Sequence, residues 1–292
     1  MFYLLIIIIS VYLIYLNYQF FVWKISISNN RYIHNRKTSD KNHNIPKKIW
    51  MFWDKGFDKS PPLCKLCVKS WKYHNPDWEL NILDNKTIYD YVDPVLIKKF
   101  KTQLSRNIID IAGFSDFIRI CLLTDYGGVW ADITTFCNKP LDSWINQVVE
   151  YGFFTPMYFY RIPLVPWYIS NWLIISTKQS SMCLKIKNAY INFILRSTKK
   201  VAYISFHFCV EKLISTDVSF KNIWGKIPFI NTRHPHLFFW YPYHNDWKSD
   251  INGKITPLYK LTYKFNNVMK NPFVMYLSQT IRLAPTTAPT TI

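Results

Sequence analysis

The chain has 292 residues and carries 36 Lys and Arg against 18 Asp and Glu, a formal charge of +18. Hydrophobic residues make up 49% and charged residues 18%, which excludes a disordered chain and a protein with many membrane spans. The positive charge favours partners that carry phosphate, such as nucleotides, anionic lipids or nucleic acids. We expect no nucleic-acid partner, because the sequence contains no nucleic-acid-binding motif.

The first 23 residues of the chain are predicted to form a membrane anchor. Residues 2–23 contain no charged side chain, and about 20 such residues suffice for a helix to cross a membrane. We therefore expect a transmembrane anchor at 1–23 and a basic stem at 24–44. Basic residues follow the anchor and none precede it, which predicts that the rest of the chain lies on the cytoplasmic side. The Golgi lumen stays open as an alternative.

Strands and helices alternate after the stem. Residues 48–53 form a short apolar run typical of a buried strand, residues 63–74 have helical periodicity, and residues 78–83 alternate as a second strand. This order of strand, helix and strand is the unit from which nucleotide-binding domains are built. Short helices are expected over residues 87–100, interrupted at Asp93-Pro94.

Residues 110–137 are the most informative stretch. Apolar residues recur at helical spacing until Gly127, where a glycine pair predicts a helix C-cap, and residues 129–131 then predict a short strand. The strand ends at Asp132, and ligands of open α/β sheets bind outside the carboxyl ends of strands. Asp116 and Arg119 share one helix face and are predicted to reach the same site, with a plain helix ion pair as the alternative.

The remaining chain completes an α/β pattern. Strands are predicted at residues 152–155 and 172–176, and helices at 182–195 and 202–214. We expect one domain over residues 45–280 and a disordered Pro/Thr-rich tail at 281–292. The six cysteines lack a compact disulfide framework, and Cys121 and Cys209 read as buried thiols. Phosphate-binding glycine loops and the nucleophile elbow of serine hydrolases are absent from the sequence.

A resemblance to a known family rests on the spacing of two motifs. Ser-Asp-x-x-Arg begins at Ser115, and Tyr-Gly-Gly-Val-Trp-x-Asp-x-Thr begins at Tyr126. Together they resemble the sugar-nucleotide core of the D-x-D glycosyltransferases. More narrowly, the chain resembles the capsular polysaccharide synthesis protein family, which is related to glycosyltransferase family 32. The motifs at 45–53, 70–78, 170–172 and 260–264 extend the resemblance in the expected order.

The resemblance implies a GT-A-type, Rossmann-like nucleotide-sugar-binding domain with a mixed central sheet. It implies transfer of a hexose from a nucleotide-sugar donor to a glycan or polysaccharide acceptor, with retention of the anomeric configuration. A divalent cation, Mn²⁺ or Mg²⁺, would be held by Asp132 and by Thr134, which stands where the family often has a second Asp. A catalytically inactive sugar- or nucleotide-binding relative is the alternative.

The same resemblance assigns the other site residues. Asp116 and Arg119 would bind the donor sugar, and together with Asp132 they are the expected catalytic residues. Trp53 would lie against the nucleotide base, with a core tryptophan as the alternative, and Thr134 would also contact the donor. Further candidates are Asn171 and Trp172 on the acceptor side, Lys260 and Lys264 as phosphate contacts, and His234, His236 and His244 as a third metal ligand or a diphosphate contact. His207, on an apolar helix, reads as a core histidine.

Overall fold

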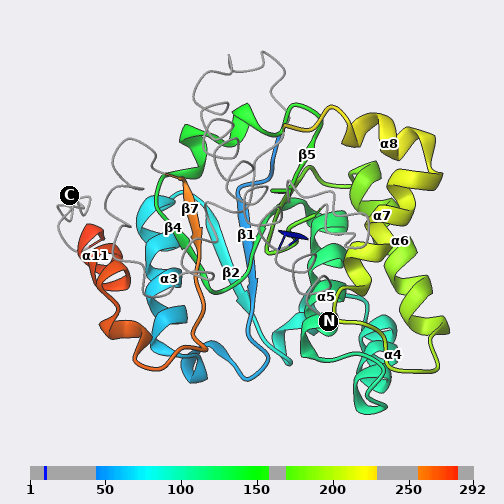
Figure 1. Cartoon of the computed structure of the whole chain (residues 1–292), viewed down its shortest axis with the longest axis horizontal. Helices are drawn as coiled ribbons and strands as arrows, with labels where there is room; N and C mark the ends of the chain where they lie inside the picture. The colour runs from blue at the N-terminus through cyan, green and yellow to red at the C-terminus, as the bar shows by residue number, and fades with distance from the viewer. Residues whose placement is uncertain (1–9, 12–43, 158–168, 229–255, 282–292) are drawn as a thin grey trace.

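The computed structural model describes residues 10–11, 44–157, 169–228 and 256–281 (Figure 1). Most of the predicted anchor, stem and tail therefore lies outside the described residues, as do the three loop histidines 234, 236 and 244. Within these ranges, no helix is both long and apolar enough to span a membrane.

A five-stranded sheet forms the centre of the fold, in the order β2-β1-β3-β6-β5. Its strands are β1 (Lys48–Phe52), β2 (Glu79–Leu83), β3 (Gly128–Ala131), β5 (Phe153–Phe154) and β6 (Leu173–Ser176). β1 runs parallel to β2 and β3, whereas β6 runs antiparallel to β3 and β5. The mixed sheet confirms the predicted α/β class.

Helices pack on both sides of this sheet (Figure 1). The α-helices are α3 (Pro62–His74), α4 (Pro94–Ser105), α5 (Ile111–Tyr126), α6 (Ser181–Arg196), α7 (Ser205–Thr216), α8 (Val218–Trp224) and α11 (Pro272–Thr280). Short 3-10 helices occur at η1 (Phe57–Lys59), η2 (Thr87–Asp90), η3 (Leu141–Ser143), η4 (Ile145–Gln147) and η5 (Val268–Lys270). α4 to α8 gather on one side, and α3 and α11 lie on the other.

A second, two-stranded sheet pairs β4 (Thr135–Cys137) with β7 (Leu258–Lys260) in antiparallel register. The Trp71 indole of α3 donates a hydrogen bond to the Thr135 carbonyl at 2.7 Å and so fixes β4 against that helix. The pairing places Lys260 opposite Thr135. Sequence periodicity did not predict this sheet, although it brings a late part of the chain beside the end of β3.

The helix α5 is the buried element that leads into the centre of the sheet. Its N-cap is Asp110, whose side chain accepts a hydrogen bond from the Gly113 N–H at 2.9 Å. It ends at Gly127, as predicted, and β3 begins at the next residue. The chain then reaches Asp132 directly after β3, so the predicted order of helix, glycine pair, strand and carboxylate is confirmed.

Gly128 lies where β3 passes the β1 backbone. Its φ is +96°, and a Cβ added there would lie 2.4 Å from the Lys48 carbonyl oxygen. Both the positive φ and the contact exclude a side chain, so Gly128→Ala should lower the free energy of unfolding by at least about 2 kcal/mol in urea titrations. Gly225→Ala is the matched control, because its φ is −65° and its nearest neighbour would be at 3.4 Å. Equal decreases in the free energy of unfolding for the two substitutions would contradict a steric requirement for glycine at position 128.

Candidate active site

A cavity of about 440 Å³ lies at the carboxyl ends of β1 and β3. One wall comes from residues 52–55 after β1, and another from the first half of α5. Residues 132–134 after β3 and residues 260–264 at the end of β7 complete it, together with side chains from α7. This is the position at which open α/β sheets bind ligands.

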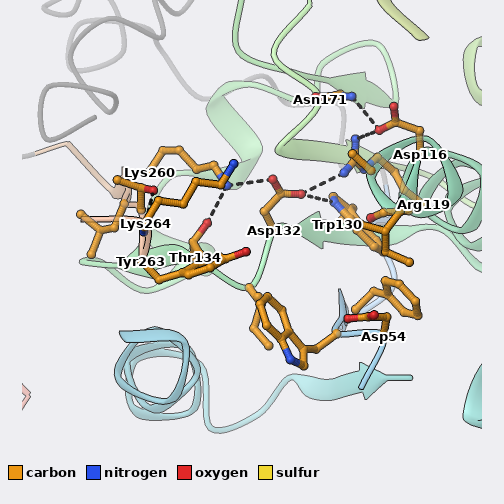
Figure 2. Close-up of a pocket in the computed structure, with 18 of the residues that line it drawn as sticks. Asp54, Asp116, Arg119, Trp130, Asp132, Thr134, Asn171, Lys260, Tyr263 and Lys264 are labelled. Atoms are coloured by element: carbon orange, nitrogen blue, oxygen red, sulfur yellow. Dashed lines mark hydrogen bonds and ion pairs between the residues drawn. The ribbon is translucent and has the colours of Figure 1, made fainter. Parts of the chain in front are cut away.

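Asp132 is the centre of the charged network in this cavity (Figure 2). Its Oδ1 accepts hydrogen bonds from an Arg119 terminal nitrogen at 2.9 Å and from the Trp130 indole at 3.1 Å. Its Oδ2 accepts one from Lys260 Nζ at 2.8 Å, and the same ammonium donates to Thr134 Oγ1 at 2.6 Å. One carboxylate therefore orients two cations at the strand end.

Asp116 lies deeper, one turn of α5 before Arg119. Its carboxylate accepts a hydrogen bond from the second terminal nitrogen of Arg119 and another from the Asn171 amide at 2.8 Å. The guanidinium also lies over the Trp130 ring, 4.9 Å from its centroid. Arg119 thus bridges Asp116 and Asp132, and its side chain is only 5% exposed. The predicted shared site of these residues is confirmed in geometry, while their roles stay predictions.

The pKa values of Asp116 and Asp132 are shifted in opposite directions. Burial raises the pKa of Asp116 to about 7, although Arg119 acts in the other direction. Loss of contact with water also acts to raise the pKa of Asp132, but the Lys260 and Arg119 charges outweigh it and hold that pKa below its ordinary value. The cations around Asp132 therefore favour its ionised form, whereas the burial of Asp116 favours its neutral form.

Aromatic side chains also line the cavity. Trp53 follows β1 and meets the Tyr263 ring edge to face, with 5.5 Å between ring centroids. Tyr203, two residues before α7, also lines the cavity, and it is exposed. Such a wall suits a flat or apolar ligand group. Sequence analysis proposed Trp53 but named neither tyrosine as a site residue, although Tyr263 lies within the motif at 260–264.

The cavity brings together all but one of the seven site residues of the sequence-based assignment: Trp53, Asp116, Arg119, Asp132, Thr134 and Asn171 line it. Trp172 does not, because its side chain is buried in the core at 4% exposure. Its backbone carbonyl accepts the Asp132 N–H at 2.8 Å and so supports the strand end, while its acceptor-side role stays a prediction. Lys260 and Lys264, the candidate phosphate contacts, line the cavity too.

His207 of α7 lines the cavity rather than only filling the core. Burial lowers its pKa to about 4 from 6.5, and the Arg119 charge adds to the effect. The unfolded chain then binds a proton before the folded one as the pH falls. The free energy of unfolding should therefore decrease as the pH falls from 6.5 toward 4. At pH 5 it should be about 2 kcal/mol lower than well above pH 6.5. Urea titrations of His207→Gln should lose this component, and an unchanged pH slope would contradict it.

The sequence relationships agree with this geometry. A family model described as capsular polysaccharide synthesis protein matches residues 17–279. The chain belongs to this family. It is 30% identical over 112 residues to the initiation-specific alpha-1,6-mannosyltransferase of Saccharomyces cerevisiae, a match covering 35% of this chain and 22% of that protein. It is 31% identical over 115 residues to the O-glycosyltransferase braB of Annulohypoxylon truncatum, covering 36% of this chain and 25% of that protein.

Among solved structures, the chain is similar to the apo-form glycosyltransferase GlyE of Streptococcus pneumoniae TIGR4. The TM-score is 0.47 with 9% identity, covering 83% of this chain and 61% of that chain. In length, the chain spans about a quarter of the two curated relatives it matches.

The divalent cation expected from the resemblance to the capsular polysaccharide synthesis family can be tested against these contacts. Asp132 Oδ2 and Thr134 Oγ1, the two predicted ligands, converge on the Lys260 ammonium. No group of three or more His, Cys, Asp or Glu side chains suited to a metal occurs in the described part of the chain. Both predicted ligands are already bonded to an ammonium, so Mn²⁺ or Mg²⁺ would have to displace Lys260 to bind them, and the pair as arranged suits that ammonium better than a divalent ion.

Proposed function

We propose that this protein is a glycosyltransferase of GT-A type that transfers a hexose from a nucleotide sugar to a hydroxyl group of a glycan or polysaccharide. The supporting observation is the Arg119 guanidinium, held between Asp116 and Asp132 at the strand ends of an α/β sheet. Membership in the capsular polysaccharide synthesis family and the similarity to the mannosyltransferase and the O-glycosyltransferase support the same activity.

The cavity offers a separate surface for each part of the donor. Trp53 and Tyr263 form the wall against which the base would lie. Asp116 and Asn171 present oxygen and amide groups to sugar hydroxyls. Arg119 also lines the cavity, where its positive charge would compensate the phosphates of the donor.

The proposed reaction exchanges one bond at the anomeric carbon for another. The bond between that carbon and the diphosphate oxygen breaks, and a bond to the acceptor oxygen forms. The acceptor proton passes to the leaving diphosphate, so the products are a glycoside and a nucleoside diphosphate. From the family resemblance we infer transfer on the same face, which retains the anomeric configuration. Cationic side chains aimed at the diphosphate stabilise the charge that develops as the bond breaks.

The direct test is an assay of the purified chain with a panel of UDP- and GDP-linked hexoses, each with and without glycan acceptors. Release of nucleoside diphosphate should occur with at least one donor, and the transferred sugar should be found on an acceptor by mass spectrometry. Binding of a donor without any turnover across the panel would instead identify an inactive sugar- or nucleotide-binding relative.

We further propose that residues 1–23 anchor the protein in a membrane, that residues 24–44 form the stem, and that residues 45–280 form the transferase domain. The uncharged run at 2–23 and the basic residues after it support this arrangement and a cytoplasmic domain. Removal of residues 1–23 should move the protein from the membrane fraction to the supernatant in detergent-free buffer. Retention of the truncated chain on membranes after a high-salt wash would contradict the anchor.

A further inference from the structure

Lys260 occupies the point where the predicted metal ligands converge. Its Nζ lies 2.8 Å from Asp132 Oδ2 and 2.6 Å from Thr134 Oγ1, as Figure 2 shows. The Lys260 side chain is only 15% exposed, so its ammonium is enclosed beside the cavity rather than solvated on the surface. A divalent cation bound to the same two oxygens would have to displace it.

The backbone fixes this position. β7 pairs with β4 so that Lys260 lies opposite Thr135, and the next residue, Leu261, donates its N–H to the Thr134 carbonyl at 3.0 Å. Lys260 at the end of β7 and Leu261 directly after it are thus both held against the segment that follows Asp132. The two-stranded sheet therefore fixes the backbone of Lys260, and its side chain reaches the Asp132 carboxylate from there.

A cation is needed at this place for glycosyl transfer, since the leaving diphosphate carries negative charge in a site partly shielded from water. Arg119 is a second cation at this place, because it shares Asp132 with Lys260. A divalent ion added between them would meet two positive side chains at close range, which Coulomb's law makes unfavourable in a partly buried site. Lys260 and Arg119 therefore already supply positive charge where the diphosphate requires it.

The ammonium also retains a donor for the ligand. A lysine has three N–H donors, and the structure uses two of them on Asp132 and Thr134. Because Lys260 lines the cavity, the third is available to a phosphate oxygen. Lys264 lines the same cavity and adds positive charge nearby.

We propose that the Lys260 ammonium takes the place of the divalent cation at the donor diphosphate, so that this protein binds its nucleotide-sugar donor without a metal ion. The proposal rests on the glycosyltransferase function proposed above and assigns the charge compensation of the diphosphate to a named side chain. Asp132 and Thr134 then orient this lysine instead of ligating a metal.

The test measures binding rather than turnover. Isothermal titration calorimetry of the full chain with inorganic pyrophosphate, UDP and GDP is carried out in excess EDTA and again with Mn²⁺. We expect at least one nucleotide and pyrophosphate to bind equally well under both conditions. Electron paramagnetic resonance should show no stoichiometric Mn²⁺ bound to the chain.

Lys260→Met should weaken pyrophosphate binding in EDTA by about 10- to 100-fold, the loss expected for one charge-assisted hydrogen bond. Lys260→Arg, which keeps a charged donor, should bind more tightly than the methionine variant. Lys270→Met is the matched control, because Lys270 is exposed on η5 and does not line the cavity. It should leave binding unchanged, and equal losses in the two methionine variants would overturn the proposal.

The outcomes separate this inference from the proposed function. Binding of UDP or GDP only in the presence of Mn²⁺, with one ion bound per chain, overturns the role of Lys260 and leaves the glycosyltransferase assignment standing. Absence of binding of all three probes under both conditions contradicts the nucleotide-sugar site and this inference with it. Both measurements use the unaltered chain, so they decide the question even if Lys260→Met does not fold.

Discussion

Replacement of Asp132 by alanine is expected to lower the turnover number for glycosyl transfer by about 10²- to 10³-fold, the loss typical of a removed charge-stabilising group. The carboxylate holds an Arg119 nitrogen at 2.9 Å and Lys260 Nζ at 2.8 Å. Without it, both cations lose the orientation that aims them at the leaving diphosphate. The measurement is the steady-state rate with the best donor from the panel.

Folding should survive this change, because Arg119 keeps Asp116 as a partner and Asp132 is 28% exposed. Asp125→Ala is the matched control, since Asp125 also forms a lysine ion pair, at 2.8 Å with Lys187, but outside the cavity. The control should keep its rate. An Asp132→Ala enzyme with near-normal turnover would remove Asp132 from the site.

Arg119→Lys is expected to impair the protein although it conserves charge. Arg119 binds Asp116 through one terminal nitrogen and Asp132 through the other. A single ammonium lacks this planar fork, so one carboxylate loses its partner. The free energy of unfolding should fall by about 1.5–3 kcal/mol, the usual contribution of a hydrogen bond between charged groups. Turnover should fall by about 10²-fold, as expected when one aligned cationic donor is lost.

Arg196→Lys makes the same chemical change at the exposed end of α6 and serves as the control. It should alter neither stability in urea nor the steady-state rate, since surface substitutions are usually nearly neutral. If Arg119→Lys behaves like this control, Arg119 acts as an ordinary helix ion pair, which is the alternative left open by its spacing from Asp116.

Local patterns in the sequence predicted most of the central sheet. The helix from residue 111, its end at Gly127 and the strand before Asp132 all follow from periodicity and glycine chemistry, which act within a few residues. The β4–β7 sheet could not be predicted in this way. Its strands have three residues each, too few to show a period, and they meet only through tertiary contacts.

The same difference between local and distant information applies to the site. Asp116 and Arg119 share a helix face, so their meeting was predictable from spacing. The contact of Lys260 with Asp132 joins residues 128 positions apart, and no pattern in a single sequence specifies such a pair. The metal site inferred for Asp132 and Thr134 therefore left out the side chain that lies between them.

The β4–β7 pairing determines when the pocket can form during synthesis on the ribosome. Thr134 and Lys260 are separated by 126 positions, and their contact forms only after β7 has been synthesised. Domains fold as the chain emerges from its N-terminal end, and distant pairings close last. A nascent chain that already contains β1 to β6 carries Asp132 and Arg119 but lacks Lys260, the second cation bound to Asp132. The pocket is thus completed only after β7 has been synthesised, and a chain truncated before residue 258 lacks that cation altogether.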